Sequence, residues 1–289
     1  MTEVNVMEKR KSRLMGQILV YLFLGVLTIF TLYPILYVVL GSFKENQELV
    51  LGGTSMLPET FQISNYIEAW RLADFGRYTF NSVFLSTMVT AGVVAISSMA
   101  GYCFARREFP GKNLLYSLMI AFMFINIGSI SLRPLFELAV KLKMNRSMWS
   151  VILICIGTNQ VTNIFLVRGY MATVPRELDE AAAIDGCSFF QIYYKIILPV
   201  LKPVLATVAL LSFRSAWNEF IMPQVFTMSN PKMRPLTVGV VALKTMGDGA
   251  AAWNIMFAGS TMSIVPIVIV YLFTSRYFMS GLTVGAVKG

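Results

Sequence analysis

Six long apolar stretches constrain the fold of this chain more than any other feature. Each is long enough to cross the hydrocarbon core of a bilayer as an α-helix, which takes about 20 residues. Only 13% of the residues are charged, whereas soluble domains carry about a quarter. We therefore predict an all-α integral membrane protein with six transmembrane helices, forming a single transmembrane domain over 1–289. The stretches cover 17–40, 80–104, 114–138, 149–171, 201–226 and 257–278.

Basic residues predict the orientation of the chain in the membrane. Lys9, Arg10, Lys11 and Arg13 precede the first stretch, and such clusters stay on the cytoplasmic side. The segment 1–16 is therefore expected in the cytoplasm, and six crossings return the tail, 279–289, to the same side. The apolar run at 17–40 is longer than the core of a signal peptide, so we expect it to be retained as the first helix. Against this orientation, Lys141, Lys143 and Arg146 fall in a predicted external loop.

Composition excludes several classes of function. The net charge is +9, but the cations are scattered between apolar stretches and form no basic face for nucleic acid. The chain has no histidine and three cysteines, so it lacks metal-ligand spacing and the commonest general base. A phosphate-binding loop needs Gly, four residues, then Gly-Lys-Ser/Thr. The single Gly-Lys pair, Gly111-Lys112, is followed by Asn113, so we predict neither an enzyme nor an ATP site.

The polar segment 175–199, between the fourth and fifth stretches, is the most informative part of the sequence. It predicts two short helices joined by a glycine. Pro175 suits a first helical turn, and Gly186 can take the left-handed conformation that ends a helix. Ser188 and Gln191 form a capping-box pattern for the second helix. Three acids near the positive end of the first helix favour its start; they are Glu177, Asp179 and Glu180.

One face of the first short helix carries mostly small side chains. Leu178, Ala181, Ala182 and Asp185 lie on the same side by three- and four-residue spacing. Small side chains allow another surface to approach the backbone closely. An ordinary amphipathic connector between two membrane helices would show the same face, so this feature alone leaves both interpretations open.

The spacing within this segment resembles the signature loop of ABC importer permeases. Glu180-Ala181-Ala182 is followed by Gly186, then by Ile196 and Leu198-Pro199. The chain is similar to the carbohydrate branch of that family, and to the smaller permease of maltose-type sugar transporters. Further residues that support the resemblance are Ser42-Phe43-Lys44, Asn81-Ser82, Ala100-Gly101-Tyr102, Phe104-Ala105-Arg106, Trp217-Asn218-Glu219 and the tail from Gly281 to Gly289.

The resemblance implies a function and a set of partners. The range 77–278 would be the importer-type permease core, and the loop between helices four and five would be a cytoplasmic coupling helix on a separate ATPase. The implied partners are a second homologous permease subunit in a heterodimer, two ATPase subunits that use ATP and Mg, and an extracellular or periplasmic sugar-binding protein. The implied location is a bacterial cytoplasmic membrane, with both termini cytoplasmic and no cofactor on this chain. The expected ATPase-coupling residues are Glu180, Ala181, Ala182, Asp185, Gly186 and Pro199, with Glu180 contacting a basic side chain.

Polar side chains inside the apolar stretches are candidates for a translocation path. A central arginine such as Arg214 costs about 3 kcal/mol on insertion scales, so it faces protein or water. It fits either a subunit interface or the path. Asn159 and Asn163 fit either a hydrated path or hydrogen bonds between helices. Asn218, beside Trp217, fits either sugar stacking or packing.

Three alternatives to a sugar importer can be weighed from the residues. An importer of amino acids, peptides or polyamines would share the loop, but the C-terminal tail and the Ser42-Phe43-Lys44 segment favour sugars. A secondary transporter needs acids inside the membrane for ion coupling, and Glu219, near a helix end, is the single candidate. A structural membrane protein leaves the spacing of the 175–199 segment unexplained.

Overall fold

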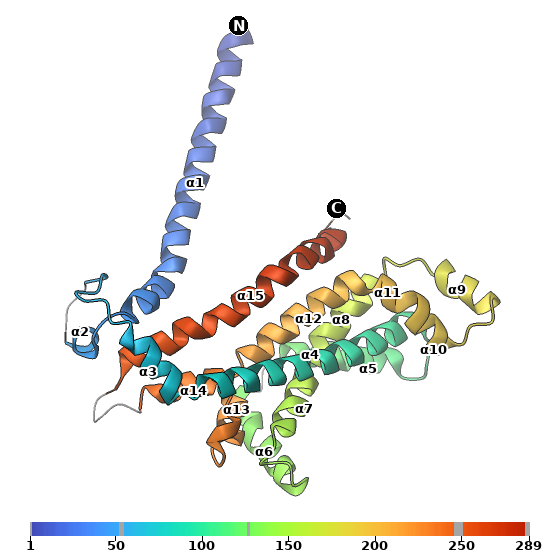
Figure 1. Cartoon of the computed structure of the whole chain (residues 1–289). Helices are drawn as coiled ribbons and strands as arrows, with labels where there is room; N and C mark the ends of the chain where they lie inside the picture. Colours follow the sequence, from blue (N-terminus) through green and yellow to red (C-terminus); the bar gives the residue numbers. More distant parts are fainter. Residues whose placement is uncertain (1, 52–54, 126–127, 246–250, 287–289) are drawn as a thin grey trace. The chain divides into compact units, whose positions relative to one another are not determined.

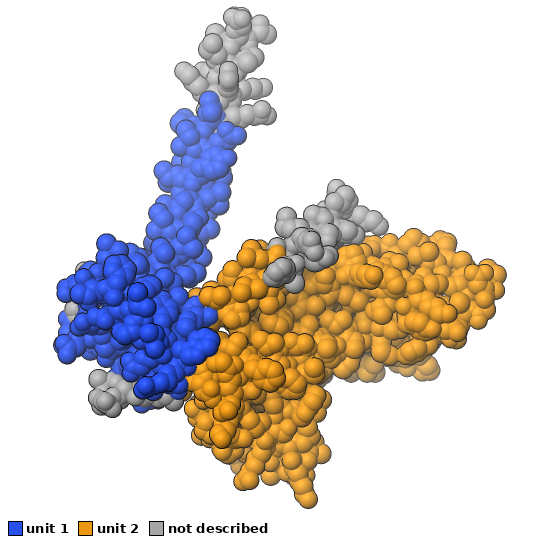
Figure 2. Space-filling view, viewed as in Figure 1, with its two compact units in different colours: residues 1–72, 243–262 blue, residues 73–242, 263–289 orange. Residues whose placement is uncertain are grey.

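The structure of the chain, a computed structural model, consists of helices joined by turns and short loops (Figure 1). It describes residues 2–51, 55–125, 128–245 and 251–286, and within those ranges no residue lies in a β-strand. The all-α class predicted from the apolar stretches is therefore confirmed. The helices group into two compact units, coloured separately in Figure 2. The first unit comprises Met1–Leu72 and Leu243–Met262, and the second comprises Ala73–Ala242 and Ser263–Gly289.

The first unit is held together by hydrogen bonds around the buried side chain of Asn65. Its Nδ2 donates to the carbonyls of Ser42 and Lys44, both at 2.9 Å. Its Oδ1 accepts from Nδ2 of Asn254, also at 2.9 Å. The buried Lys44 forms a 2.8 Å ion pair with Glu48, so the segment around Ser42 is a structural part of this unit. The helices of the unit are α1 (Thr2–Gly41), α2 (Asn46–Val50), α3 (Ser64–Leu72) and the first part of α15 (Trp253–Ala286).

The second unit is built around α4 (Phe75–Arg106). This helix packs against α12 (Lys202–Trp217), α8 (Gln160–Met171) and α7 (Met148–Thr158). The approach of α4 to α8 requires a glycine, because a Cβ at Gly101 would lie 2.5 Å from Cγ1 of Val167. The remaining elements of the unit are α5 (Lys112–Phe124), η1 (Gly128–Ser131), α6 (Leu132–Lys141), α9 (Glu177–Ile184), α10 (Phe189–Ile192), η2 (Tyr193–Ile197), α11 (Leu198–Val200), α13 (Ile221–Phe226), η3 (Pro231–Met233), α14 (Leu236–Leu243) and the later part of α15.

Several helices in the described ranges are long and apolar enough to cross a membrane. Three qualify as they stand, namely Leu14–Gly41, Phe75–Arg106 and Trp253–Leu272. Two bent pairs qualify if each counts as one crossing: α7 with α8, bent by 45°, and Phe189–Val200 with α12, bent by 78°. The chain is therefore a multi-pass membrane protein.

Three of the predicted stretches, 114–138, 149–171 and 201–226, are not continuous helices, and the prediction was wrong at these places. Within 114–138, α5 ends at Phe124, and a short 3-10 turn beginning at Gly128 precedes α6. Gly128 has a φ of 52°, which a continuous right-handed helix does not contain. Within 201–226, α12 ends at Trp217 and α13 begins at Ile221. Pro223 explains this break, because its ring clashes with the carbonyl four residues earlier, at Glu219.

The bend between α7 and α8 arises from polar side chains. Oγ1 of Thr158 donates to the carbonyl of Ile154 at 3.1 Å, and Nδ2 of Asn159 donates to the carbonyl of Cys155 at 2.8 Å. These side chains compete with backbone N–H groups for the helical carbonyls, which bends helices. Hydropathy therefore located this span but did not predict its bend.

Candidate functional site

The 175–199 segment forms two short helices, as predicted, and the first of them is α9. Its first turn is closed by the carbonyl of Arg176, which accepts from the N–H groups of Asp179 at 2.9 Å and Glu180 at 3.1 Å. Pro175 lies two residues before the first residue of α9, Glu177. The prediction that Pro175 occupies the first turn was therefore wrong; the proline instead fixes the backbone that leads into the helix.

Gly186 ends α9 in the left-handed conformation, with a φ of 80°. Its N–H donates to the carbonyl of Ala183 at 3.1 Å, and the N–H of Cys187 donates to the carbonyl of Ala182 at 3.0 Å. This pair of bonds is the Schellman motif, which satisfies the last carbonyls of a helix. A Cβ at Gly186 would meet no atom within 4 Å, so the need for glycine here is conformational and not steric. The predicted role of Gly186 as the end of the helix is confirmed.

The second helix, α10, begins with the predicted capping box. The N–H of Gln191 donates to Oγ of Ser188 at 3.4 Å, and the N–H of Ser188 donates to Oε1 of Gln191 at 2.8 Å. The chain continues through η2 and α11 and, after the single turn residue Leu201, enters α12 at a bend of 78°. A displacement of the short helices would therefore reach α12 across one residue.

Most of the expected coupling residues lie on the surface of the second unit. Glu180, Ala181, Asp185 and Gly186 are exposed, and Pro199 is exposed on α11. Ala182, by contrast, is 4% exposed and belongs to the apolar core. Ala182 thus attaches α9 to the fold, while the other residues leave a surface of small and acidic groups.

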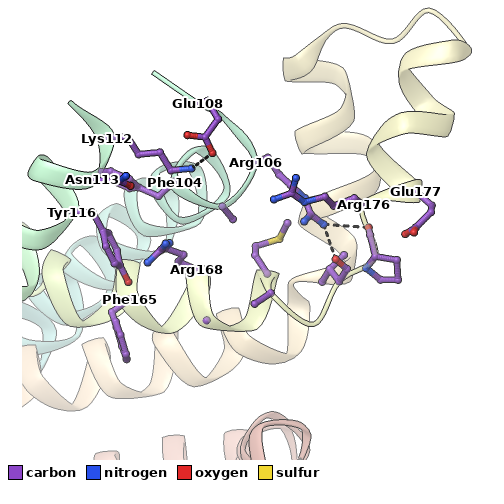
Figure 3. A pocket seen from close by; sticks show the side chains of 16 residues that line it. Phe104, Arg106, Glu108, Lys112, Asn113, Tyr116, Phe165, Arg168, Arg176 and Glu177 are labelled. Atoms are coloured by element: carbon purple, nitrogen blue, oxygen red, sulfur yellow. Dashed lines mark hydrogen bonds and ion pairs between the residues drawn. The ribbon is translucent and has the colours of Figure 1, made fainter. Parts of the chain in front are cut away.

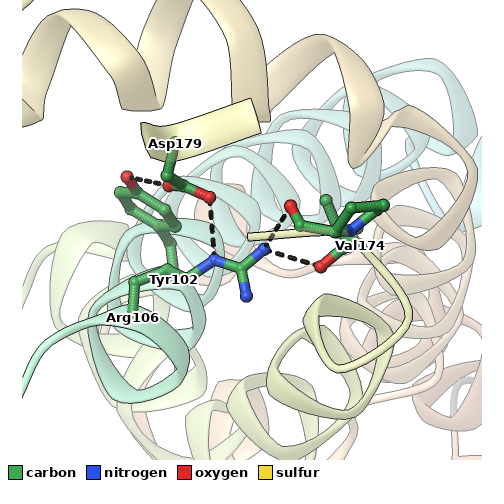
Figure 4. Close-up of polar contacts among 5 residues, drawn as sticks. Tyr102, Arg106, Val174 and Asp179 are labelled. Atoms are coloured by element: carbon green, nitrogen blue, oxygen red, sulfur yellow. Dashed lines mark hydrogen bonds and ion pairs between the residues drawn. The ribbon is translucent and has the colours of Figure 1, made fainter. Parts of the chain in front are cut away.

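Asp179 is held by two side chains near the end of α4 (Figure 4). The hydroxyl of Tyr102 donates to Oδ1 at 2.7 Å, and Nε of Arg106 donates to Oδ2 at 2.9 Å. Nη2 of Arg106 also donates to the carbonyls of Val174 at 2.7 Å and Pro175 at 3.2 Å. The arginine therefore fixes both α9 and the backbone that leads into it.

The ring of Tyr102 also holds the second short helix. It stacks on Phe189, with ring centroids 4.8 Å apart, and on Tyr193 at 5.6 Å. The hydroxyl groups of Tyr193 and Ser98 are 2.7 Å apart and share a hydrogen bond. The guanidinium of Arg107 lies over the ring of Phe189, 4.1 Å from its centroid. The end of α4 thus contacts both helices of the 175–199 segment.

Sequence reasoning did not find this attachment. Asp179 was assigned to the dipole of α9, and Arg106 was named among the residues that support the family resemblance. A signal was present, because Tyr102 and Arg106 are four residues apart and therefore share a helix face. Nothing in the sequence indicated which acid they would meet.

The polar residues proposed for a translocation path have different surroundings. Arg214 is exposed on α12 and Asn218 is exposed directly after its last residue, and Nδ2 of Asn218 donates to the carbonyl of Arg214 at 2.9 Å. Asn163 is buried, and its Nδ2 donates to the carbonyl of Asn159 at 2.7 Å. Gln160, between these two asparagines, has buried amide atoms without a hydrogen-bond partner in the described chain.

Comparisons with known proteins place these features in a family. The family described as binding-protein-dependent transport system inner membrane component matches residues 92–279. The chain is 37% identical to the arabinooligosaccharides transport system permease protein AraQ of Halalkalibacterium halodurans, over 89% of this chain and 91% of the relative. It is 31% identical to the galactooligosaccharides transport system permease protein GanQ of Bacillus subtilis, over 93% and 94%. It also resembles a chain in the crystal structure of a bacterial ABC transporter involved in the import of the acidic polysaccharide alginate. That likeness has a TM-score of 0.75 and 25% identity, and covers 93% of this chain and 98% of the other.

Proposed function

Because the chain belongs to the family of binding-protein-dependent transport system inner membrane components, we propose that it is the permease subunit of an ABC importer for sugars or oligosaccharides. The observation that carries this proposal is the 175–199 segment. It exposes the small and acidic surface of α9 while its other side is fixed to α4 through Asp179. A docking element needs both properties, since it must be accessible to a partner and must transmit force to the membrane helices.

The relatives support a carbohydrate as substrate. AraQ and GanQ are named for transport of arabinooligosaccharides and galactooligosaccharides, and the related crystal structure concerns import of alginate. The three named substrates are all chains of linked sugars. The chain covers more than nine-tenths of each of these proteins, so the likeness extends over nearly the whole permease. No observation favours an amino acid, peptide or polyamine instead.

In the proposed mechanism, α9 docks on a separate ATPase subunit. Glu180, Ala181, Asp185 and Gly186 form the docking surface, and Glu180 contacts a basic side chain of the ATPase. ATP and Mg are used by the ATPase pair, and this chain binds neither. When the pair closes on ATP, α9 and α10 move, and α12 follows through the bend at Leu201 that joins it to α11. The helices α9, α10 and α12 therefore form a two-state element, and ATP bound to another subunit shifts the equilibrium between its two states.

The proposed topology has six crossings with both termini in the cytoplasm. The three long helices provide three crossings, the bent pair of α7 and α8 provides a fourth, and α12 with α13 provides a fifth. The sixth crossing consists of α5, the turn that follows it and α6, which together cover the predicted stretch 114–138. The range 77–278 is then the permease core, and the 175–199 segment lies in the cytoplasm of a bacterial cell.

A complete importer in this proposal has further subunits. A second homologous permease forms a heterodimer with this chain, two ATPases bind from the cytoplasm, and an extracellular or periplasmic binding protein delivers the sugar. Arg214 and Asn218 are exposed at the end of α12, so they are available either to the second permease or to the path between the subunits. In this proposal the half-buried Asn159 borders the path at the bend between α7 and α8, and the buried Asn163 holds its carbonyl.

Uptake by the reconstituted complex tests this function. Proteoliposomes with both permeases and the ATPase inside receive the binding protein, ATP and one labelled substrate: arabinotriose, galactotriose or trialanine. We expect ATP-dependent accumulation of at least one trisaccharide and none of the peptide. Accumulation of trialanine without either sugar would favour the peptide importer and refute the carbohydrate assignment.

A further inference from the structure

A basic cavity of about 1050 Å³ lies in the second unit beside the attachment of α9 (Figure 3). It is bounded by the end of α4, the start of α5, the end of α8 and the backbone leading into α9. Four basic and two acidic side chains line it, so positive charge is in excess. The charged lining residues are Arg106, Lys112, Arg168, Arg176, Glu108 and Glu177.

Two of the four cations already have carboxylate partners. Arg106 pairs with Asp179 at 2.9 Å, and Lys112 pairs with Glu108 at 2.8 Å. The hydrogen bond from Lys112 holds the pKa of the Glu108 carboxyl below its ordinary value, so this acid is ionised at neutral pH. Glu108 is therefore occupied by Lys112. The charged lining residues that remain are Arg168, Arg176 and Glu177, so positive charge is still in excess.

Arg168 is a half-buried guanidinium without an acceptor. It lies over the ring of Tyr116, 3.7 Å from the ring centroid. Within the part of the chain that the structure describes, it forms no ion pair and donates no hydrogen bond. A stacked guanidinium keeps its N–H groups in a plane parallel to the ring, so stacking leaves these donors unused. A guanidinium in this condition is suited to an anion.

We propose that this cavity binds a phosphate ester, with Arg168 as its main ligand and Arg176 as a further cation of the same lining. The planar fork of arginine matches phosphate oxygens in a bidentate geometry. The aromatic lining supports an amphipathic ligand, because Phe104, Tyr116 and the 44% exposed Phe165 border the same cavity. The chemistry is shared by the head group of an anionic phospholipid and by soluble phosphate esters.

The position of the cavity favours the lipid as the source. It lies at the C-terminal end of α4, which is long and apolar enough to cross the membrane. Basic pockets at the ends of membrane helices attract anionic head groups. A phosphate on Arg168 and Arg176 would join the end of α8 to the backbone that precedes α9. Bound lipid would thus stabilise the segment that carries the proposed coupling surface. Lipid binding to the cavity does not itself depend on the proposed coupling to an ATPase.

Binding measurements on the purified complex test the proposal. The permease pair with its ATPase, in detergent, is titrated with dioleoyl phosphatidylglycerol or dioleoyl phosphatidylcholine, and lipid adducts are counted by native mass spectrometry. Glycerol 1-phosphate is titrated separately by calorimetry. We expect selective retention of phosphatidylglycerol, weakened about tenfold by Arg168→Gln and severalfold by Arg176→Gln. Arg133→Gln is the matched control, because Arg133 pairs with Glu137 on α6 outside the cavity.

Each outcome decides between the sources or against the site. Retention of phosphatidylglycerol without binding of glycerol 1-phosphate assigns the lipid, whereas glycerol 1-phosphate binding that Arg168→Gln weakens assigns a soluble ester. Equal binding of both lipids, or equal losses in Arg168→Gln and Arg133→Gln, would overturn the proposal. If Arg168→Gln fails to assemble, Arg176→Gln decides, because Arg176 is exposed and its replacement removes no core contact.

Discussion

Asp179→Asn removes the negative charge that Arg106 and Tyr102 share at the base of α9. The side chains of Arg106 and Asp179 are 9% and 17% exposed, so the pair resembles a buried pair more than an exposed one. Breaking a buried pair costs about 3–5 kcal/mol, and an exposed pair contributes about 0–1 kcal/mol. Arg106 keeps its two bonds to backbone carbonyls in the variant. We therefore expect a loss of about 2 kcal/mol in local stability, between these limits.

Hydrogen exchange of the intact complex measures this loss. A change of about 2 kcal/mol corresponds to a roughly thirtyfold increase in local opening, so amides in α9 should exchange about thirty times faster. Tyr102→Phe removes one hydrogen bond from the same carboxylate and should have a smaller effect, about 1 kcal/mol. Glu177→Gln is the matched control, since it removes an acid from the same turn that forms no ion pair in the described chain. Equal exchange in Asp179→Asn and Glu177→Gln would refute the role of α4 as the attachment of α9.

Three further predictions concern the loop, the topology and the absence of an ATP site. Gly186→Ala should destabilise the end of α9 by about 1 kcal/mol, because φ is positive there. Gly76→Ala is the control and should not destabilise the protein, because a Cβ at either glycine meets no described atom within 4 Å and φ is not positive at Gly76. Thermal unfolding of the complex compares the two variants. A cysteine at Glu59 should react with an impermeant maleimide in intact cells and one at Ser188 should not; labelling at Ser188 would invalidate the six-crossing topology. The purified chain alone should hydrolyse no ATP, and activity in a preparation shown by mass spectrometry to lack other subunits would contradict this.

The local conformations of the 175–199 segment were predictable because each depends on a few neighbouring residues. A glycine that ends a helix and a serine paired with a glutamine three positions later specify backbone geometry by themselves. Gly186 and Ser188 accordingly have the predicted conformations.

Features that depend on tertiary contact were not predictable in the same way. Asp179 meets Tyr102 and Arg106 across more than 70 positions of sequence, and periodicity carries no information about such pairs. Hydropathy likewise marked 114–138 as one helix, because a window average does not register the turn at Gly128. The acids and cations of the basic cavity were visible in the sequence, but only the fold shows that Arg168 has no acceptor among the residues that the structure describes.

Photo-cross-linking from α9 tests the central claim, that this surface docks on the ATPase. Benzoylphenylalanine is introduced at the exposed Ala181 in the assembled importer, and the adducts formed on irradiation are identified by mass spectrometry. The same residue at the exposed Glu137, on α6, is the control. The account predicts an adduct between the permease and the ATPase from position 181 and none from position 137. Absence of the ATPase adduct from position 181, in a complex that still transports, would contradict it.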